Sequence, residues 1–108
     1  MFRSEIYLAI LALLVAPPVS HAADAKAGRA LAAQCQVCHG LDGIAKIPIA
    51  PHLAGESEIY LQSQLKAFRS GKREHEIMTV VAKDLSDQEI ADLAAWYASI
   101  AISVTMPK

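Results

Sequence analysis

The feature that most constrains this chain is the run CQVCH at residues 35–39, which contains both cysteines of the sequence. A Cys-x-x-Cys-His run is typical of covalent haem attachment. Because the two thiols lie about one helical turn apart, Cys35 and Cys38 can both react with the vinyl groups at one edge of a haem. The imidazole of His39 is then placed to bind the iron. The pattern predicts one covalently attached haem c and His39 as an iron ligand.

Three other uses of a cysteine pair have to be weighed against haem attachment. A thioredoxin-like Cys-x-x-Cys begins a helix after a β-strand, and no alternating strand pattern precedes Cys35. A zinc site requires a second pair of ligands at suitable spacing, whereas His52 and His75 are isolated from each other. A disulfide between Cys35 and Cys38 would leave His39 without a role. We therefore favour haem attachment.

The first 22 residues have the pattern of a secretory signal peptide. Arg3 gives a positive start, residues 6–16 are almost entirely apolar, and two prolines follow. Ser20 and Ala22 are the small residues expected at −3 and −1 of a cleavage site. The apolar run is shorter than the roughly 20 residues that span a bilayer. We expect cleavage after Ala22 and a periplasmic domain of residues 23–108 without stable membrane insertion; a retained anchor is the alternative.

The charge balance excludes one class of partner. Ten basic and eleven acidic residues give a formal net charge of −1, so there is no basic excess for nucleic acid. The predicted mature domain is also close to the size at which a hydrophobic core alone becomes marginal. A buried porphyrin would add apolar contacts at the centre of such a domain.

An all-α fold with three main helices around one covalent haem is predicted for the mature domain. The first helix covers residues 25–34, is capped by Asp24 and leads into the cysteine pair. The second covers residues 57–71 and ends at a glycine. The third begins with the capping box SDQE at residues 86–89. Residues 40–51 contain several glycines and prolines and are expected to form a loop that wraps the haem.

Helical spacing predicts which side chains face the core. In the second helix, the apolar residues at helical spacing are Leu61, Leu65 and Phe68. Its polar residues are expected to face solvent, and they are Glu58, Gln62, Lys66 and Arg69. The buried face of the third helix is predicted to consist of Ile90, Leu93, Ala94, Tyr97 and Ala101.

The sequence resembles the class I c-type cytochromes, in particular the small bacterial periplasmic cytochrome c4 and c-553 domains. The resemblance extends from Gly28 to Ala98, which is nearly all of the mature chain. The matching segments are CQVCHG at 35–40, PHLAG at 51–55, YL at 60–61, QL at 64–65, FRSGKR at 68–73, IM at 77–78, LSD at 85–87 and LAAWYA at 93–98.

The resemblance implies that Met78, in the connector between the second and third helices, is the other axial iron ligand. A thioether is a soft, neutral ligand that favours Fe(II) and raises the reduction potential. Three alternatives remain: Met78 is an ordinary core residue, Met106 in the tail replaces it, or His75 in the same connector binds the iron.

The resemblance also implies roles for residues around the ligands. The Pro51 carbonyl is expected to accept the Nδ1 proton of His39, and Leu53 is expected to pack on the haem face; a simple rigid loop is the alternative. Gly28 with Trp96 and Tyr97 matches a close crossing of the first and last helices, although a glycine could stand there by chance.

Function follows from the predicted coordination. His39, Met78 and the porphyrin nitrogens fill all the iron positions, which predicts an electron carrier and not an enzyme.

Expected partners are redox proteins such as a membrane oxidase, a reductase or a periplasmic dehydrogenase, with the chain a monomer or a subunit of a small complex. A haem subunit of a periplasmic dehydrogenase is the alternative, and a peroxidase-like enzyme would require a labile Met78. Four basic residues lie close together at the end of the second helix: Lys66, Arg69, Lys72 and Arg73. They are expected to form either a docking surface for an acidic redox partner or a solvated face, and we favour the solvated face.

Overall fold

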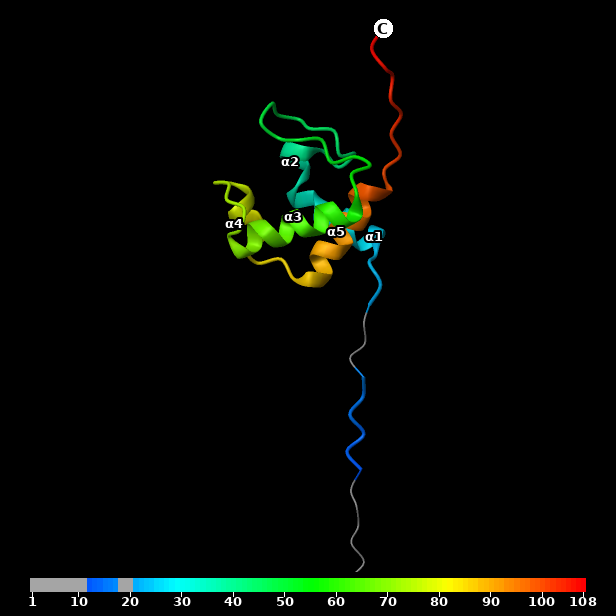
Figure 1. Cartoon of the computed structure of the whole chain (residues 1–108), viewed down its shortest axis with the longest axis vertical. Coiled ribbons are helices and arrows are strands. Elements are labelled where there is room, and N and C mark those ends of the chain that lie inside the picture. The colour runs from blue at the N-terminus through cyan, green and yellow to red at the C-terminus, as the bar shows by residue number, and fades with distance from the viewer. Residues whose placement is uncertain (1–11, 18–20) are drawn as a thin grey trace, which may run out of the picture.

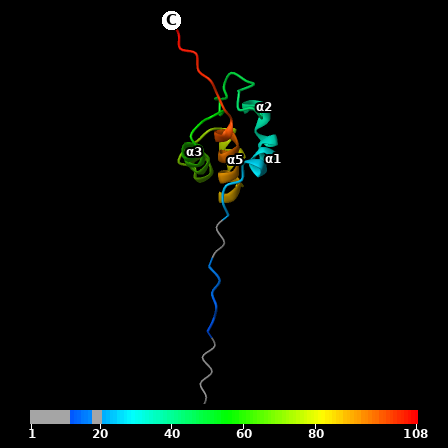
Figure 2. The same ribbon diagram turned by 90° about the vertical axis from the view of Figure 1, so that its right-hand side faces the viewer.

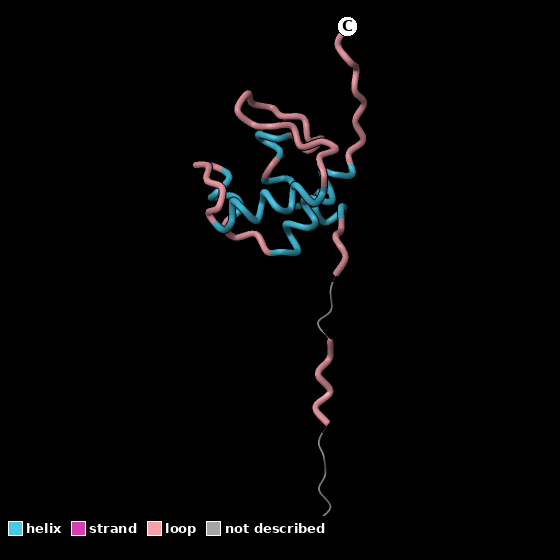
Figure 3. Tube along the Cα trace, in the orientation of Figure 1, coloured by secondary structure: helices cyan, strands magenta, loops and turns pink. Residues whose placement is uncertain are grey.

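The computed structural model describes residues 12–17 and 21–108 (Figure 1). Most of the expected signal peptide, residues 1–11 and 18–20, lies outside the described residues. The regular elements of the described chain are all helical (Figure 3), and the all-α prediction is confirmed. In chain order they are α1 (Ala25–Leu31), the 3₁₀ helix η1 (Ala32–Gln34), α2 (Gln36–His39), α3 (Glu58–Ser70), α4 (Met78–Ala82) and α5 (Asp87–Ser99).

Helix α5 lies between α1 and α3 (Figure 2) and packs against both. The crossing of α1 and α5 depends on Gly28, which is buried. A Cβ atom at this position would overlap the backbone carbonyl of Asp92 and lie 3.0 Å from the Cβ of Trp96. Only glycine lets the two backbones approach this closely. The close helix crossing is therefore present as expected.

The main helices begin and end where local signals place them. The Ser57 side chain accepts the Tyr60 N–H at the start of α3, and Gly71 ends α3 with a left-handed φ of 82°. Ser86 and Glu89 form the capping box of α5. The hydrophobic core joins these helices to α4 and η1, and its members are Ala32, Leu61, Phe68, Ala82, Leu85, Ile90, Leu93, Ala94 and Tyr97.

Three details differ from the sequence-based expectations. Ala101 is exposed and lies beyond α5, because the chain becomes extended at Ile100. Arg69 does not point freely into solvent: its Nη1 donates to the Leu85 carbonyl at 2.9 Å and its Nη2 to Asp87 at 2.6 Å. The connector before α5 contains α4, which the pattern did not indicate because this single turn is rich in β-branched residues of low helix propensity.

The ends of the described chain lie outside the helical core. Residues 12–17, 21–24 and 101–108 have no regular secondary structure, and the C-terminal tail extends away from α5 (Figure 1). In the part of the chain that the structure describes, no helix is long and apolar enough to cross a bilayer.

Candidate haem site

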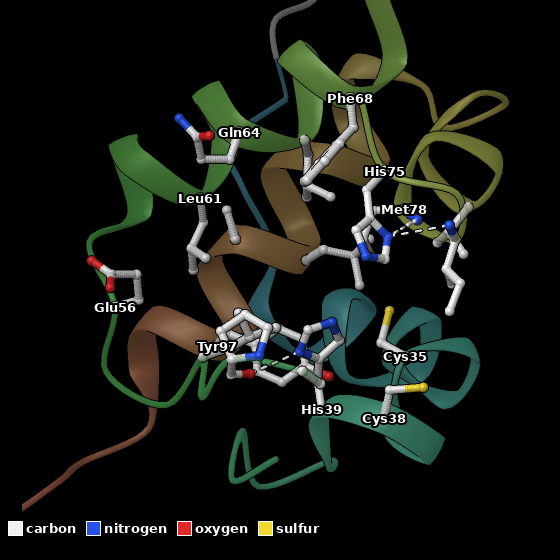
Figure 4. Close-up of a pocket in the computed structure, with 18 of the residues that line it drawn as sticks. Cys35, Cys38, His39, Glu56, Leu61, Gln64, Phe68, His75, Met78 and Tyr97 are labelled. Carbon is white, nitrogen blue, oxygen red and sulfur yellow. Dashed lines mark hydrogen bonds between the residues drawn. The ribbon is translucent and has the colours of Figure 1, made fainter. Parts of the chain in front are cut away.

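An apolar cavity of about 390 Å³ opens between the helices and the loop that follows α2. Its volume falls within the roughly 300–1,000 Å³ of small-molecule and cofactor sites. All the residues predicted from the sequence as haem contacts line it together, and Figure 4 labels Cys35, Cys38, His39 and Met78 among them. They are Cys35, Cys38, His39, Pro51, Leu53 and Met78. Helices α3 and α5 contribute Leu61, Leu65, Phe68, Leu93 and Ala94 to the apolar wall, and the loop after α2 contributes Ile47, Ile49, Ala50, Pro51 and Leu53.

The two cysteines lie side by side next to His39 (Figure 4), and both are unpaired thiols. The His39 N–H donates to the Cys35 carbonyl at 3.0 Å, which closes the helical turn that brings the motif together. Burial raises the pKa of the Cys35 thiol to about 11, and the nearby Cys38 adds to this shift. A thioredoxin-type nucleophile needs a lowered thiol pKa. The raised pKa of the Cys35 thiol therefore argues against a thioredoxin-like redox site.

The imidazole of His39 is buried, and its orientation is fixed by the loop. Its Nδ1 lies 2.9 Å from the Pro51 carbonyl oxygen (Figure 4). Because a carbonyl oxygen can only accept, Nδ1 carries the proton in this contact. The lone pair of Nε2 is then free for a metal, and the hydrogen bond increases its basicity.

The loop that presents Pro51 is held by bonds to its own backbone and by His52. The N–H groups of Leu53 and Ala54 both donate to the Gly43 carbonyl, at 2.8 and 3.0 Å. The Ala45 N–H donates to Nδ1 of His52 at 2.8 Å. His52, which sequence reasoning left as a surface or hydrogen-bonding residue, therefore joins the two sides of the loop.

Two aromatic side chains of α5 hold the chain immediately after His39. The Tyr97 hydroxyl donates to the Gly40 carbonyl at 3.0 Å, and the Trp96 indole N–H donates to the Leu41 carbonyl at 3.0 Å. Burial raises the pKa of Tyr97, so the hydroxyl keeps its proton. Sequence reasoning missed these bonds. The available signal was that buried Tyr and Trp need a polar partner.

Met78 is half-buried at the start of α4 and lines the cavity. Met106, in contrast, is 77% exposed in the C-terminal tail and does not line it. His75 also reaches the cavity, but its Nδ1 lies 3.2 Å from the Ile77 N–H and 3.4 Å from the Met78 N–H (Figure 4). This ring nitrogen is thus engaged with the backbone at the start of α4.

The surroundings fit a haem and not a bare metal ion. Across the described residues, no cluster of three or more His, Cys, Asp or Glu side chains could hold a metal ion. The donor set is instead two thiols, one imidazole and one thioether around a largely apolar space. Such a set suits a porphyrin that brings its own iron and equatorial nitrogens.

Comparison with known proteins agrees with this geometry. The profile of the Cytochrome c family matches residues 25–101. The chain is 43% identical over 104 residues to a cytochrome c4 of Pseudomonas aeruginosa, a match that covers 95% of this chain and 52% of the relative. It is 47% identical over 81 residues to cytochrome c-554(548) of Halomonas halodenitrificans, which covers 72% of this chain and 98% of the relative.

Solved structures give the same result. A crystal structure of reduced cytochrome c4 from Pseudomonas stutzeri matches with a TM-score of 0.70 and 39% identity, covering 77% of this chain and 48% of that one. A thiosulfate dehydrogenase from Marichromatium purpuratum matches with a TM-score of 0.66 and 36% identity, covering 79% of this chain and 22% of that one. The chain thus spans about half the length of the cytochrome c4 proteins that it matches. It belongs to the cytochrome c family, a family of electron-transfer proteins that carry covalently attached haem c.

Proposed function

We propose that this protein carries single electrons on one haem c, bonded covalently to Cys35 and Cys38, with His39 and Met78 as the axial iron ligands. The observation that carries the proposal is the convergence of these four side chains on one apolar cavity. They come from two segments that are far apart in the sequence, residues 35–39, which comprise α2 and its N-cap, and the start of α4.

The side chains around the cavity support a role in electron transfer. The bound haem supplies an iron that alternates between Fe(III) and Fe(II). The Pro51 carbonyl holds the proton of His39 on Nδ1 and so directs Nε2 toward the metal. The Met78 thioether would occupy the other axial position and favour Fe(II). If His39 and Met78 hold the iron in this way, no iron position would remain open to a substrate, which supports a carrier role.

We also propose that residues 1–22 are a signal peptide removed after Ala22, so that residues 23–108 act in the periplasm. In support of this, Ala22 is exposed and residues 21–24 have no regular secondary structure, which suits access by a peptidase. Electron donors and acceptors would be redox proteins, such as a membrane oxidase, a reductase or a periplasmic dehydrogenase.

A second candidate function is that of a haem subunit bound to a periplasmic dehydrogenase. The structural match to part of a thiosulfate dehydrogenase supports it. Gel filtration of the protein from its native host separates the two candidates. Elution as a small monomer is expected for a diffusing carrier, and co-elution with a larger catalytic chain is expected for a subunit.

The mass of the intact periplasmic protein tests the proposal most simply. We expect the mass of residues 23–108 plus one haem, because the two thioether bonds survive denaturation. As controls, Cys35→Ala and Cys38→Ala should each retain haem through one bond, with the pyridine haemochrome spectrum of one remaining vinyl group. A mass without haem would contradict covalent attachment, and a chain that still begins at Met1 would contradict cleavage.

A further inference from the structure

The haem cavity has one permanently cationic side chain among its described lining residues, that of Arg73. Arg73 follows the left-handed turn at Gly71 that ends α3. Its backbone N–H donates to the Ala67 carbonyl at 3.1 Å, which fixes where the side chain begins.

The guanidinium group of Arg73 is held in place by two side chains of α3. It lies over the ring of Phe68, 4.6 Å from the ring centroid. Its Nη1 donates to Oε1 of Gln64 at 2.7 Å. Stacking and hydrogen bonding together restrict a long side chain that would otherwise sample many rotamers.

No carboxylate of the described residues forms an ion pair with this cation; Glu56, which also lines the cavity, accepts the Ser57 N–H instead. Within the described residues there are two ion pairs, Lys46 with Asp42 and Arg69 with Asp87, and neither includes Arg73. A guanidinium has five N–H donors in a rigid fork, and the bond to Gln64 uses one of them. The remaining donors are suited to a planar anion such as a carboxylate.

The location of Gln64 indicates which planar anion the free N–H donors of Arg73 would meet. Figure 4 shows Gln64 across the cavity from Cys35 and Cys38. The cysteines take the vinyl edge of the haem, and the two propionates of a haem extend from the part of the ring away from the vinyl groups. The propionate carboxylates are therefore directed toward the side of the cavity where Gln64 holds Arg73.

We propose that Arg73, positioned by Phe68 and Gln64, binds a propionate carboxylate of the haem. This inference rests on the proposed haem attachment. The ion pair keeps the propionate ionised, and the cation stabilises the reduced iron relative to the more positive oxidised iron. Because a propionate that stays ionised takes up no proton, Arg73 keeps the reduction potential constant down to a lower pH.

The test measures the midpoint potential of the holoprotein against pH for wild type, Arg73→Gln and Arg73→Lys, with Lys72→Gln as the matched control. Lys72 is exposed, as Arg73 is, but it does not line the cavity. In Arg73→Gln the unpaired propionate holds its proton to higher pH, so the window in which the potential falls with rising pH should move up toward neutrality. Lys72→Gln should keep the shape of the wild-type profile.

The propionate bending bands in the resonance Raman spectrum provide a second readout. They should shift in Arg73→Gln and stay unchanged in Lys72→Gln. Profiles and bands of Arg73→Gln that match those of Lys72→Gln would overturn the proposal. If Arg73→Gln yields no holoprotein, Arg73→Lys provides the test. A lysine keeps the positive charge but cannot form two parallel hydrogen bonds to a carboxylate, so the pH range in which the potential falls should move up by less than in Arg73→Gln. A potential–pH profile identical to that of wild type would contradict the binding of a propionate by Arg73. Wild-type protein without covalent haem would instead refute the proposed function.

Discussion

At the scale of single residues, the proposed iron site depends on how backbone groups orient the side chains. His39 is aligned by one carbonyl of a loop that lies 12 residues further along the chain. The motif residues could be predicted from the sequence because their spacing is set by the chemistry of one haem edge. The contacts of Tyr97 and Arg73 could not, since each depends on a partner brought close only by the folded chain.

Met78→Ala tests the second axial ligand. A methionine sulfur bound to ferric haem gives a weak charge-transfer absorption in the far red, and loss of the thioether should abolish this band. Met106→Ala, which alters an exposed tail residue, should leave the band intact. Met78→His should lower the reduction potential because imidazole favours Fe(II) less than a thioether does.

Two results would change the ligand assignment. If the far-red band persists in Met78→Ala, Met78 is not the ligand and Met106 is the first residue to examine. If the wild-type protein lacks the band and has the spectrum of a bis-imidazole haem, His75 is implicated, and its contacts with the start of α4 would have to open.

At the scale of helices, the predictions succeed where the signals are local. Caps at Ser57 and Ser86 and the glycine at position 71 set the bounds of α3 and α5. Prediction fails for α4, a single turn with no side-chain cap, because its placement depends on packing against α3. The prediction that Arg69 faces solvent is also incomplete, because this side chain donates hydrogen bonds that join α3 to the start of α5.

Gly28→Ala tests the crossing of α1 and α5. Alanine would normally stabilise a helix interior by about 1 kcal/mol relative to glycine. Here the added methyl group meets the Asp92 backbone, and overpacking of this kind costs about 1–3 kcal/mol. We therefore expect a net decrease in the free energy of unfolding, measured by denaturant titration of the holoprotein. The exposed helical position Ala30 provides the comparison, since Ala30→Gly should lose only the propensity difference. A Gly28→Ala variant more stable than wild type would show that the crossing is not tight.

At the scale of the whole molecule, the sequence indicates an all-α domain around a haem, and the described chain confirms the helical fold. The core residues that line the cavity come from α3, α5 and, with Leu85, the segment between α4 and α5, and this arrangement follows from helical periodicity only in part. The shape of the cavity also requires the loop after α2, which glycines and prolines identify as irregular without specifying its path. His52 and the Gly43 carbonyl supply that path through contacts across the loop.

We propose that the protein carries one electron on a haem whose iron has no open position. A spectroelectrochemical titration of the purified holoprotein, performed under argon and repeated under carbon monoxide, tests it directly. We predict a single reversible one-electron transition with the same midpoint potential under both gases. A ligand that binds only the reduced state stabilises that state by mass action, so an open iron would raise the midpoint under carbon monoxide. Such an increase would show that the reduced iron has an open position, and the absence of a one-electron transition would show that the protein is not a one-electron carrier.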